Sequence, residues 1–172
     1  MAETAYNYPF NAFNFEVSLT IENPPTELGL AKPLCYSEFS ECDGLEMTME
    51  PKTVREGGNN TQSIHLVGPV NYGNLTLKRG MSLNQDLWKW FQCCAGHPAS
   101  KAIRRGITAN AQITVKRKAT GNTEEQIVYK LFDCLPIKIK GAPLNAKDGV
   151  IAIEELQIAY SYFTIGTDTN GS

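Results

Sequence analysis

The chain has 172 residues, 42% of them hydrophobic, and its 16 Lys and Arg against 18 Asp and Glu leave a formal net charge of -2. This length and apolar content suit one globular domain with its own core and argue against a disordered chain. The near balance of charge argues against a dedicated nucleic-acid binder, and no apolar run approaches the roughly 20 residues of a transmembrane helix.

The first half of the chain carries the period-two alternation that is typical of half-buried strands. Apolar residues occupy every second position from 13 to 21 and predict the first strand, which the prolines at 24 and 25 end. A second strand-like run covers residues 34–49 and is interrupted by the turn dipeptide Asp43-Gly44. Leu75 and Leu77 mark a further strand.

One amphipathic helix is predicted in the middle of the chain. Ser82 is a good N-cap, and Gln85 three residues later completes a capping-box pattern. The apolar face that follows at about 100° per residue comprises Leu83, Leu87, Trp90, Phe91 and Cys94. Gly96 and Pro98 end the helix. Trp88 lies off this face, where it either covers the flank of the core or marks a contact surface.

The second half of the chain returns to strand patterns. Three alternating runs lie at residues 111–115, 127–131 and 137–139. In the last segment Ile153 has one parity whereas Leu156 and Ile158 have the other, so we expect a β-bulge near Glu154-Glu155. The polar tail from Gly166 onward is expected to fray.

Together these patterns predict one mainly β domain over residues 1–172, with an ordered core at about 13–163. The expected fold is an antiparallel β-barrel or sandwich with one flanking α-helix. The N-terminus has neither the basic nor the apolar region of a signal peptide, and the five cysteines form no Cys-x-x-Cys motif. We therefore expect reduced thiols and synthesis in the cytoplasm.

Few residues support catalysis or metal binding. The chain has two histidines, and His97 lies four residues after Cys93 on the edge of the predicted helix. Two ligands are too few for a structural zinc site, which takes four. Neither a phosphate-binding loop nor a nucleophile elbow occurs. We therefore expect no catalytic residue, no cofactor and no metal.

A hairpin is predicted around Met47 and Met49, which alternate with polar residues just before Pro51 and the glycine-rich turn at 57–60. Such a hairpin could pack on its own domain. It could also project and pair with the sheet edge of a neighbouring molecule. The alternation does not choose between these two arrangements.

A longer set of residues resembles a known family. Residues 39–60 read FSECDGLEMTMEPKTVREGGNN, residues 68–81 read GPVNYGNLTLKRGM, and residues 87–91 read LWKWF. Near the end stand LPIK at 135–138, LNA at 144–146 and IEEL at 153–156. Over about residues 13–163 the chain resembles the tail-tube family of contractile phages and phage-like extracellular contractile injection systems.

The resemblance implies a structural protein with a fold like the haemolysin-coregulated protein of type VI secretion. Its subunits would close into hexameric rings that stack into a hollow inner tube. A contracting sheath would drive this tube, with its cargo, through a target envelope. The implied partners are further copies of the chain, the sheath protein, baseplate and spike proteins, and protein cargo in the lumen. The implied place of action is a phage tail-like particle, either extracellular, membrane-anchored or part of a virion.

The resemblance also implies a subunit interface. Residues 46–60 match the family's extended hairpin or loop, which contacts neighbouring subunits. The expected interface residues are Met47, Met49, Pro51, Val54, Arg55 and Glu56, with Gly57 and Gly58 permitting the turn. We expect Arg55→Glu to block tube assembly while the monomer stays folded.

Three alternatives stay open beside the injection-system tube. The first is a phage tail tube that conducts DNA, which composition does not separate from a protein conduit. The second is a monomeric small-ligand β-barrel, which would need a pocket with convergent polar groups. The third, an enzyme, rests on Cys93 or Cys94 with His97 and has the weakest basis.

Overall fold

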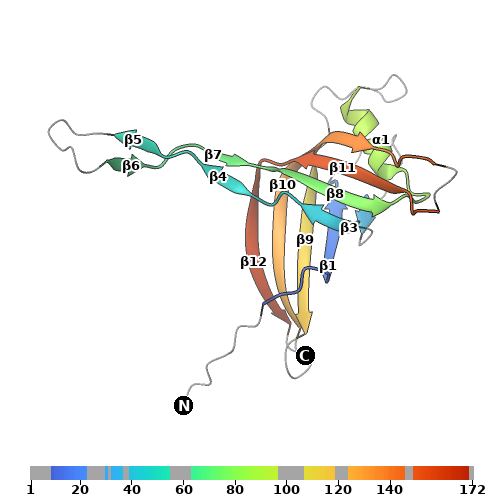
Figure 1. The fold of residues 1–172 in the computed structure, drawn as a ribbon, viewed down its shortest axis with the longest axis horizontal. Coiled ribbons are helices and arrows are strands. Elements are labelled where there is room, and N and C mark those ends of the chain that lie inside the picture. Colours follow the sequence, from blue (N-terminus) through green and yellow to red (C-terminus); the bar gives the residue numbers. More distant parts are fainter. Residues whose placement is uncertain are drawn as a thin grey trace, which may run out of the picture.

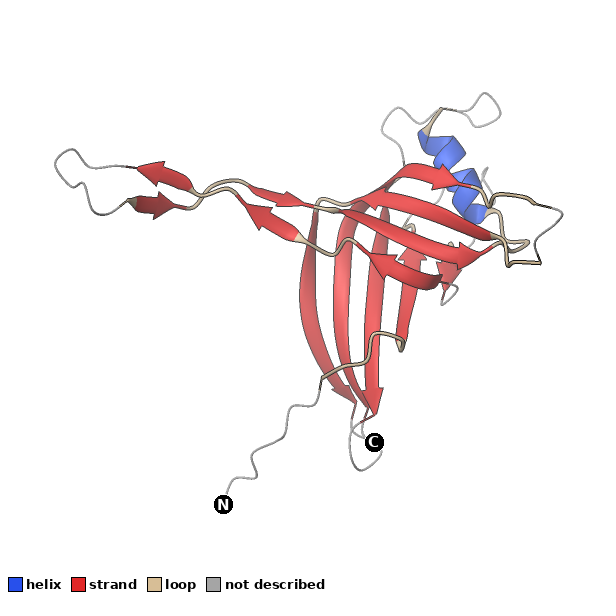
Figure 2. Ribbon diagram, viewed as in Figure 1, coloured by secondary structure: helices blue, strands red, loops and turns tan. Residues whose placement is uncertain are grey.

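The computed structural model describes residues 9–22, 30, 32–36, 39–54, 63–96, 107–118, 124–145 and 149–170. These residues form antiparallel strands and one helix, as the sequence patterns predict (Figure 1, Figure 2). The elements in chain order are β1 (Phe15–Thr20), β2 (Cys35–Tyr36), β3 (Phe39–Asp43), β4 (Met47–Met49), β5 (Lys52–Val54), β6 (Ile64–Leu66), β7 (Val70–Tyr72), β8 (Asn74–Gly80), α1 (Asp86–Cys94), β9 (Ala109–Lys118), β10 (Glu124–Lys140), β11 (Ile153–Ala159) and β12 (Tyr162–Asn170).

Strand β10 joins the two parts of an eight-stranded sheet. Its first part lies between β9 and β12, and its last part, residues 135–140, pairs with β11. The register shifts between Leu131 and Cys134, where Asp133 has a positive φ of 54°. Such an irregularity bends a strand, so the two alternating runs that the sequence separates here are one bent strand of 17 residues. In Figure 1, β3, β8 and β11 cross the upper end of the strands β1, β9, β10 and β12.

The core lies where the two parts of the sheet and α1 meet. Helix α1 buries Leu87 and Trp90, and the indole Nε1 of Trp90 donates a hydrogen bond of 2.6 Å to the carbonyl oxygen of Ile107. The strands contribute side chains that are at most 3% exposed, among them Val17, Leu19, Leu75, Leu77, Ile113, Leu131, Leu156 and Ile158. Burial of this kind contributes roughly 25 cal/mol per Å² of apolar surface. The alternation in β1, β8, β9 and β11 therefore has the cause that the sequence predicts, namely burial of the apolar side of each strand in the core.

The helix begins later than the capping-box pattern predicts. It starts at Asp86, its N-cap is Gln85 without a side-chain cap, and Leu83 precedes the helix with its side chain fully exposed. The reason is that the residues before α1 make other hydrogen bonds: the guanidinium Nη2 of Arg79 donates to the carbonyl oxygen of Asn84 at 2.8 Å. The prediction that Leu83 belongs to the core-facing side of the helix is therefore wrong. Phe91, which the same prediction includes, is half-buried.

The β-bulge expected near Glu154-Glu155 is absent from β11, which pairs with β8 in regular register from Ile153 to Ala159. The parity of the strand is kept because Glu154 takes a core position and is 5% exposed. The irregularity lies instead in the partner strand β10, between Pro136 and Lys138. The prediction of a frayed tail is wrong for residues 166–170, since β12 extends to Asn170 along β10, and residues 171–172 lie outside the described residues.

Candidate subunit interface

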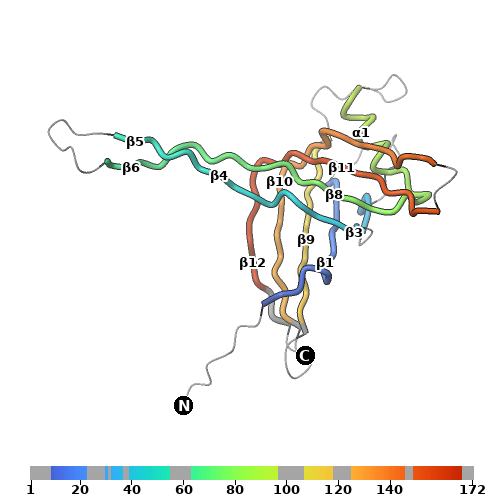
Figure 3. The backbone as a smooth tube through the Cα atoms, in the orientation of Figure 1, coloured from blue at the N-terminus to red at the C-terminus, as the bar shows by residue number. Residues whose placement is uncertain are grey.

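Between β3 and β8 the chain leaves the body as a two-stranded ribbon, which we call the arm (residues 46–73, described at 46–54 and 63–73). Strand β4 pairs with β7 nearer the body, and β5 pairs with β6 farther out. Figure 1 shows the arm projecting well beyond the sheet, and in Figure 3 its two backbones cross between β4 and β5. This crossing agrees with the strong twist of two-stranded ribbons. Of the two arrangements that the alternation leaves open, the structure shows the projecting hairpin.

The arm buries almost nothing. Every residue of β4, β5, β6 and β7 is exposed except Tyr72, which is half-buried. Its large apolar side chains are exposed by 39% to 85%, namely Met47, Met49, Val54, Ile64, Leu66, Val67 and Val70. An isolated two-stranded hairpin is marginally stable in water. Exposed apolar groups of this extent mark an interaction surface.

The register gives the part of the arm near the body one apolar and one polar face. Met47 lies opposite Tyr72 and Met49 opposite Val70, so these four side chains share a face. Thr48 lies opposite Asn71 on the other face. The part of the arm nearest the body is therefore an amphipathic ribbon, and on its apolar face Met47, Met49 and Val70 stay exposed.

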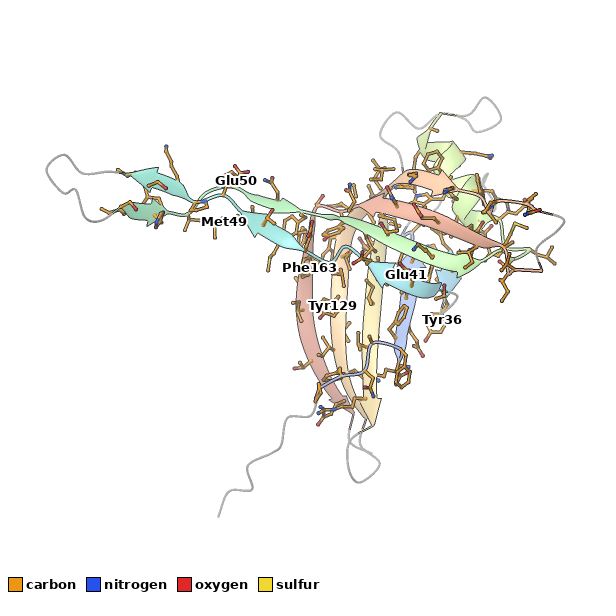
Figure 4. All side chains as sticks on the ribbon, viewed as in Figure 1. Tyr36, Glu41, Met49, Glu50, Tyr129 and Phe163 are labelled. Carbon is orange, nitrogen blue, oxygen red and sulfur yellow. The ribbon has the colours of Figure 1, made fainter. Side chains whose placement is uncertain are left out.

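An aromatic cluster holds the base of the arm. The ring of Tyr72 lies 5.8 Å from that of Tyr160 and 5.9 Å from that of Phe163, and Tyr129 lies 6.3 Å from Phe163. Figure 4 shows Phe163 and Tyr129 on β12 and β10, where the arm leaves the sheet. Offset and edge-on aromatic pairs at these distances are favourable. The cluster therefore ties β7 to the end of the core.

Hydrogen bonds at the base set the direction in which the arm leaves. The hydroxyl of Tyr160 lies 3.2 Å from each of the carbonyl oxygens of Gly44 and Glu46, which share its one proton. Burial raises the pKa of Tyr160, so the hydroxyl keeps the proton that it donates. Gly44 has a positive φ of 97°, and a Cβ there would lie 2.0 Å from the carbonyl oxygen of Asn74. Only glycine fits this turn.

With this geometry in view, comparison with known proteins identifies the family. The model of the family described as T4-like virus tail tube protein gp19 matches residues 11–164. The chain belongs to this tail-tube family. It is a structural tube subunit. No curated protein sequence matches the chain.

Solved structures share the fold of this tail-tube protein. A chain from the baseplate of the anti-feeding prophage is 23% identical with a TM-score of 0.70, covering 92% of this chain and 95% of that chain. A chain from the sheath–tube complex of the PVC extracellular contractile injection system is 17% identical with a TM-score of 0.68, covering 94% and 93%. A crystal structure of Hcp protein is 12% identical with a TM-score of 0.52, covering 90% and 98%.

The structure places four of the expected interface residues of the tail-tube protein on the arm. Met47, Met49, Pro51 and Val54 are all exposed. The others, Arg55, Glu56, Gly57 and Gly58, lie outside the described residues, so the expectation for Arg55→Glu stays a prediction.

Sequence reasoning missed the return half of the arm. The expected segment ended at residue 60, whereas β6 and β7 carry Ile64, Leu66 and Val70 as further exposed apolar side chains. The signal was present, because Ile64 and Leu66 alternate with His65. The run of three residues was too short to read as a strand beside the glycine-rich turn.

Features that would support a metal site or a reactive thiol are few in the described parts of the tail-tube protein. They hold no group of three or more side chains that could bind a metal ion, and none of their helices is long and apolar enough to cross a membrane. Burial raises the pKa of Cys42 and of Cys134 to about 12 and also raises that of Cys94, which disfavours reactive thiolates. The predicted partner of Cys93, His97, lies outside the described residues.

Proposed function

We propose that this chain is the inner-tube subunit of an extracellular contractile injection system, in which hexameric rings stack into a hollow conduit for protein cargo inside a contractile sheath. The observation that carries the proposal is the exposed amphipathic arm. Met47, Met49 and Val70 on its apolar face are exposed in the single chain, so further subunits are the natural cover for them. Family membership supports the tube, and the fold shared with the PVC and anti-feeding prophage chains favours the injection system.

Open sheet edges support ring formation. Strand β12 pairs with β10 on one side, and no described strand pairs with its other side. At the other end of the same four strands, β2 pairs with β1 at Ser18 and Leu19 only, which leaves the edge of β1 before Ser18 open. Unblunted edges recruit further strands. Joining the β12 edge of one subunit to the β1 edge of the next is a heterologous contact, and such contacts close into rings.

Charge on the outer face of the second part of the sheet supports a sheath contact. Glu41, Lys78, Glu155 and Lys140 alternate in sign across β3, β8, β11 and β10, and Lys78 Nζ lies 2.8 Å from Glu41 Oε1. A tube that slides when its sheath contracts needs a contact that releases readily. A balanced charged face provides this better than an apolar one, because exposed ion pairs contribute little net binding energy.

A second candidate is the tail tube of a contractile phage, which would conduct DNA. The observation that favours it is the family model itself, whose members are described as tail tube proteins of T4-like viruses. Both candidates share the tube and differ in what passes through it. In either one, the subunit would be made in the cytoplasm and would act in a tail-like particle.

Electron microscopy of the purified chain over a concentration series, with and without its baseplate proteins, tests the tube. We expect hollow tubes with six-fold rings, at the latest when a baseplate is present to start assembly. Monodisperse monomers under both conditions would contradict the proposal. Particles isolated from the native host then separate the two candidates: protein in nuclease-resistant tubes supports the injection system, and DNA in a capsid-bearing particle supports the phage tail.

A further inference from the structure

Tyr160 connects the base of the arm to the open edge of the sheet. It lies between β11 and β12, and only Ser161 separates it from the first residue of β12. Strand β12 pairs with β10 on one side, and its other side is not paired with any described strand. In Figure 1 the arm leaves the sheet where β12 begins. Because Tyr160 is 8% exposed, its side chain is held in the body.

Both strands of the arm are fixed to this one side chain. The hydroxyl of Tyr160 lies 3.2 Å from each of the carbonyl oxygens of Gly44 and Glu46, the residues that lead into β4. The centre of its ring lies 5.8 Å from that of Tyr72, the last residue of β7, and 6.0 Å from that of Phe163 in β12. The outgoing strand is therefore held by the oxygen of Tyr160 and the returning strand by its ring.

The two carbonyl oxygens have other donors besides the hydroxyl. The backbone nitrogen of Glu46 donates to the carbonyl oxygen of Gly44 at 3.0 Å, and the backbone nitrogen of Gly73 donates to that of Glu46 at 3.1 Å. Removing the hydroxyl therefore leaves neither oxygen unsatisfied, and an unsatisfied buried group is the largest cost of losing a hydrogen bond. The hydroxyl thus contributes more to the direction of the arm than to the folding of the body.

We propose that Tyr160 is a positioning residue for tube growth, whose hydroxyl holds the arm at one angle to the β12 edge before a second copy joins. The inference rests on the proposed function, in which the arm and the sheet edges both contact neighbouring copies. Two contacts at a fixed spacing reinforce each other, because the first raises the effective concentration for the second. An arm that is already oriented also avoids the ordering cost of binding.

This role has its own kinetic signature. Losing the orientation of the free arm should slow the joining of copies and leave their dissociation unchanged, since the contacts in the finished tube are the same. Losing a contact residue has the opposite effect, because most substitutions in an interface act on dissociation. The growth rate plotted against subunit concentration separates the two, since its slope measures joining and its intercept measures dissociation.

Tyr160→Phe tests the role, because it removes the hydroxyl and keeps the ring. In growth from pre-formed tube ends, followed by light scattering, the slope should fall about fivefold, the factor that one hydrogen bond contributes. The intercept should stay the same. Tyr129→Phe is the matched control, since Tyr129 is half-buried in the same aromatic cluster and its hydroxyl has no hydrogen bond among the described residues. An unchanged slope, faster dissociation or an equal fall in the control would overturn the proposal.

Spin-label distances in the monomer measure the position of the arm directly. The labels are carried by unnatural amino acids at Lys52 in β5 and Thr164 in β12, which are both exposed, because the chain has five cysteines of its own. Pulsed electron paramagnetic resonance should give one narrow distance distribution for the unmodified chain and for Tyr129→Phe. The distribution for Tyr160→Phe should be at least twofold broader. Equal widths in all three would overturn the positioning role.

The outcomes distinguish this inference from the proposed function. If the unmodified chain forms no tubes, the proposed function fails, and the distances in the monomer still decide whether Tyr160 holds the arm. If tubes grow and the slope for Tyr160→Phe is unchanged, the tube stands and only the positioning role fails. The unfolding midpoint of the variant should stay within a few degrees of that of the unmodified chain. A variant that does not fold would show that the body needs the hydroxyl and would also overturn the proposal.

Discussion

The body and the arm are built from the same kind of alternating sequence, yet they end in opposite situations. In the body, the apolar side of each strand packs against the other part of the sheet or against α1, and even the charged pair Arg79 and Glu154 is buried. In the arm, Met47, Met49 and Val70 face solvent. Alternation therefore predicts that a strand has one apolar and one polar face, but it does not predict what covers the apolar face.

The difference has an energetic consequence. The body gains its stability within one chain, so it is expected to fold as a monomer. The arm gains the burial of its apolar face only when another molecule binds, and binding then stabilises the bound form by mass action. Stability and assembly should therefore respond to different substitutions, and four changes test this separation.

Removing the arm should have the largest effect on assembly and a small effect on the body. Residues 48–71 are replaced by Asn-Gly, a two-residue hairpin turn that joins Met47 to Tyr72 and keeps the aromatic base. We expect tube formation to be lost while the thermal unfolding midpoint stays within a few degrees. Circular dichroism and electron microscopy measure the two properties, and a body that no longer folds would refute the separation.

Breaking the buried ion pair should have a large effect on the stability of the body. Glu154→Leu removes the carboxylate that neutralises Arg79 and should destabilise the body by about 3–5 kcal/mol. For a chain of this size the unfolding midpoint should fall by roughly 10 °C. The double variant Arg79→Met with Glu154→Leu should recover most of the loss, because it replaces both charges by apolar groups. A single variant as stable as the unmodified chain would show that the pair is not needed.

Gly68→Ala should weaken the arm without touching the body. A Cβ at this position would lie 1.7 Å from the carbonyl oxygen of Glu50, so the two backbones of the arm must move apart. We expect lower tube yield and an unchanged unfolding midpoint. Gly149→Ala is the control, since a Cβ at Gly149 meets no atom within 4 Å. A lowered midpoint for Gly68→Ala would mean that the arm contributes to monomer stability.

Glu16→Gln should have the smallest effect and should depend on pH. The hydrogen bond from Lys116, together with one from Tyr36, lowers the pKa of Glu16 below its ordinary value of 4.5. Its contribution is therefore present above that ordinary value and is lost as the pH falls through the lowered pKa. The variant should be less stable by under about 1 kcal/mol near neutral pH. Urea unfolding in neutral and acid buffer measures this, and an equal difference in both would exclude the charge of the Glu16 carboxylate as the cause.

Much of the fold follows from local pattern, and the exceptions have identifiable causes. The alternation in β1 and β9 predicts the core-facing residues because each strand has one covered face. The parity of β11 misleads, because Glu154 occupies a core position that a sequence pattern assigns to an apolar residue. Its partner Arg79 lies 75 residues away along the chain, so no local window contains both.

The candidate site divides in the same way. The alternation of Met47 and Met49 with polar residues predicts a hairpin that could have one apolar and one polar face. The resemblance to the tail-tube family predicts that this hairpin belongs to a tube subunit. The capping-box pattern at Ser82 and Gln85 predicts a helix start that the hydrogen bond from Arg79 to Asn84 displaces. This displacement leaves Leu83 exposed, which no helical periodicity could show.

The sequence by itself determined the fold class, the family and the presence of the hairpin, because period-two alternation and a long run of matching residues are properties of the chain alone. The tertiary structure decided that the hairpin projects and that Glu154 is buried against Arg79 and Trp88. These outcomes depend on which distant strands pair and on what remains uncovered afterwards. Both are decided by packing across the whole molecule, which no local stretch of sequence contains.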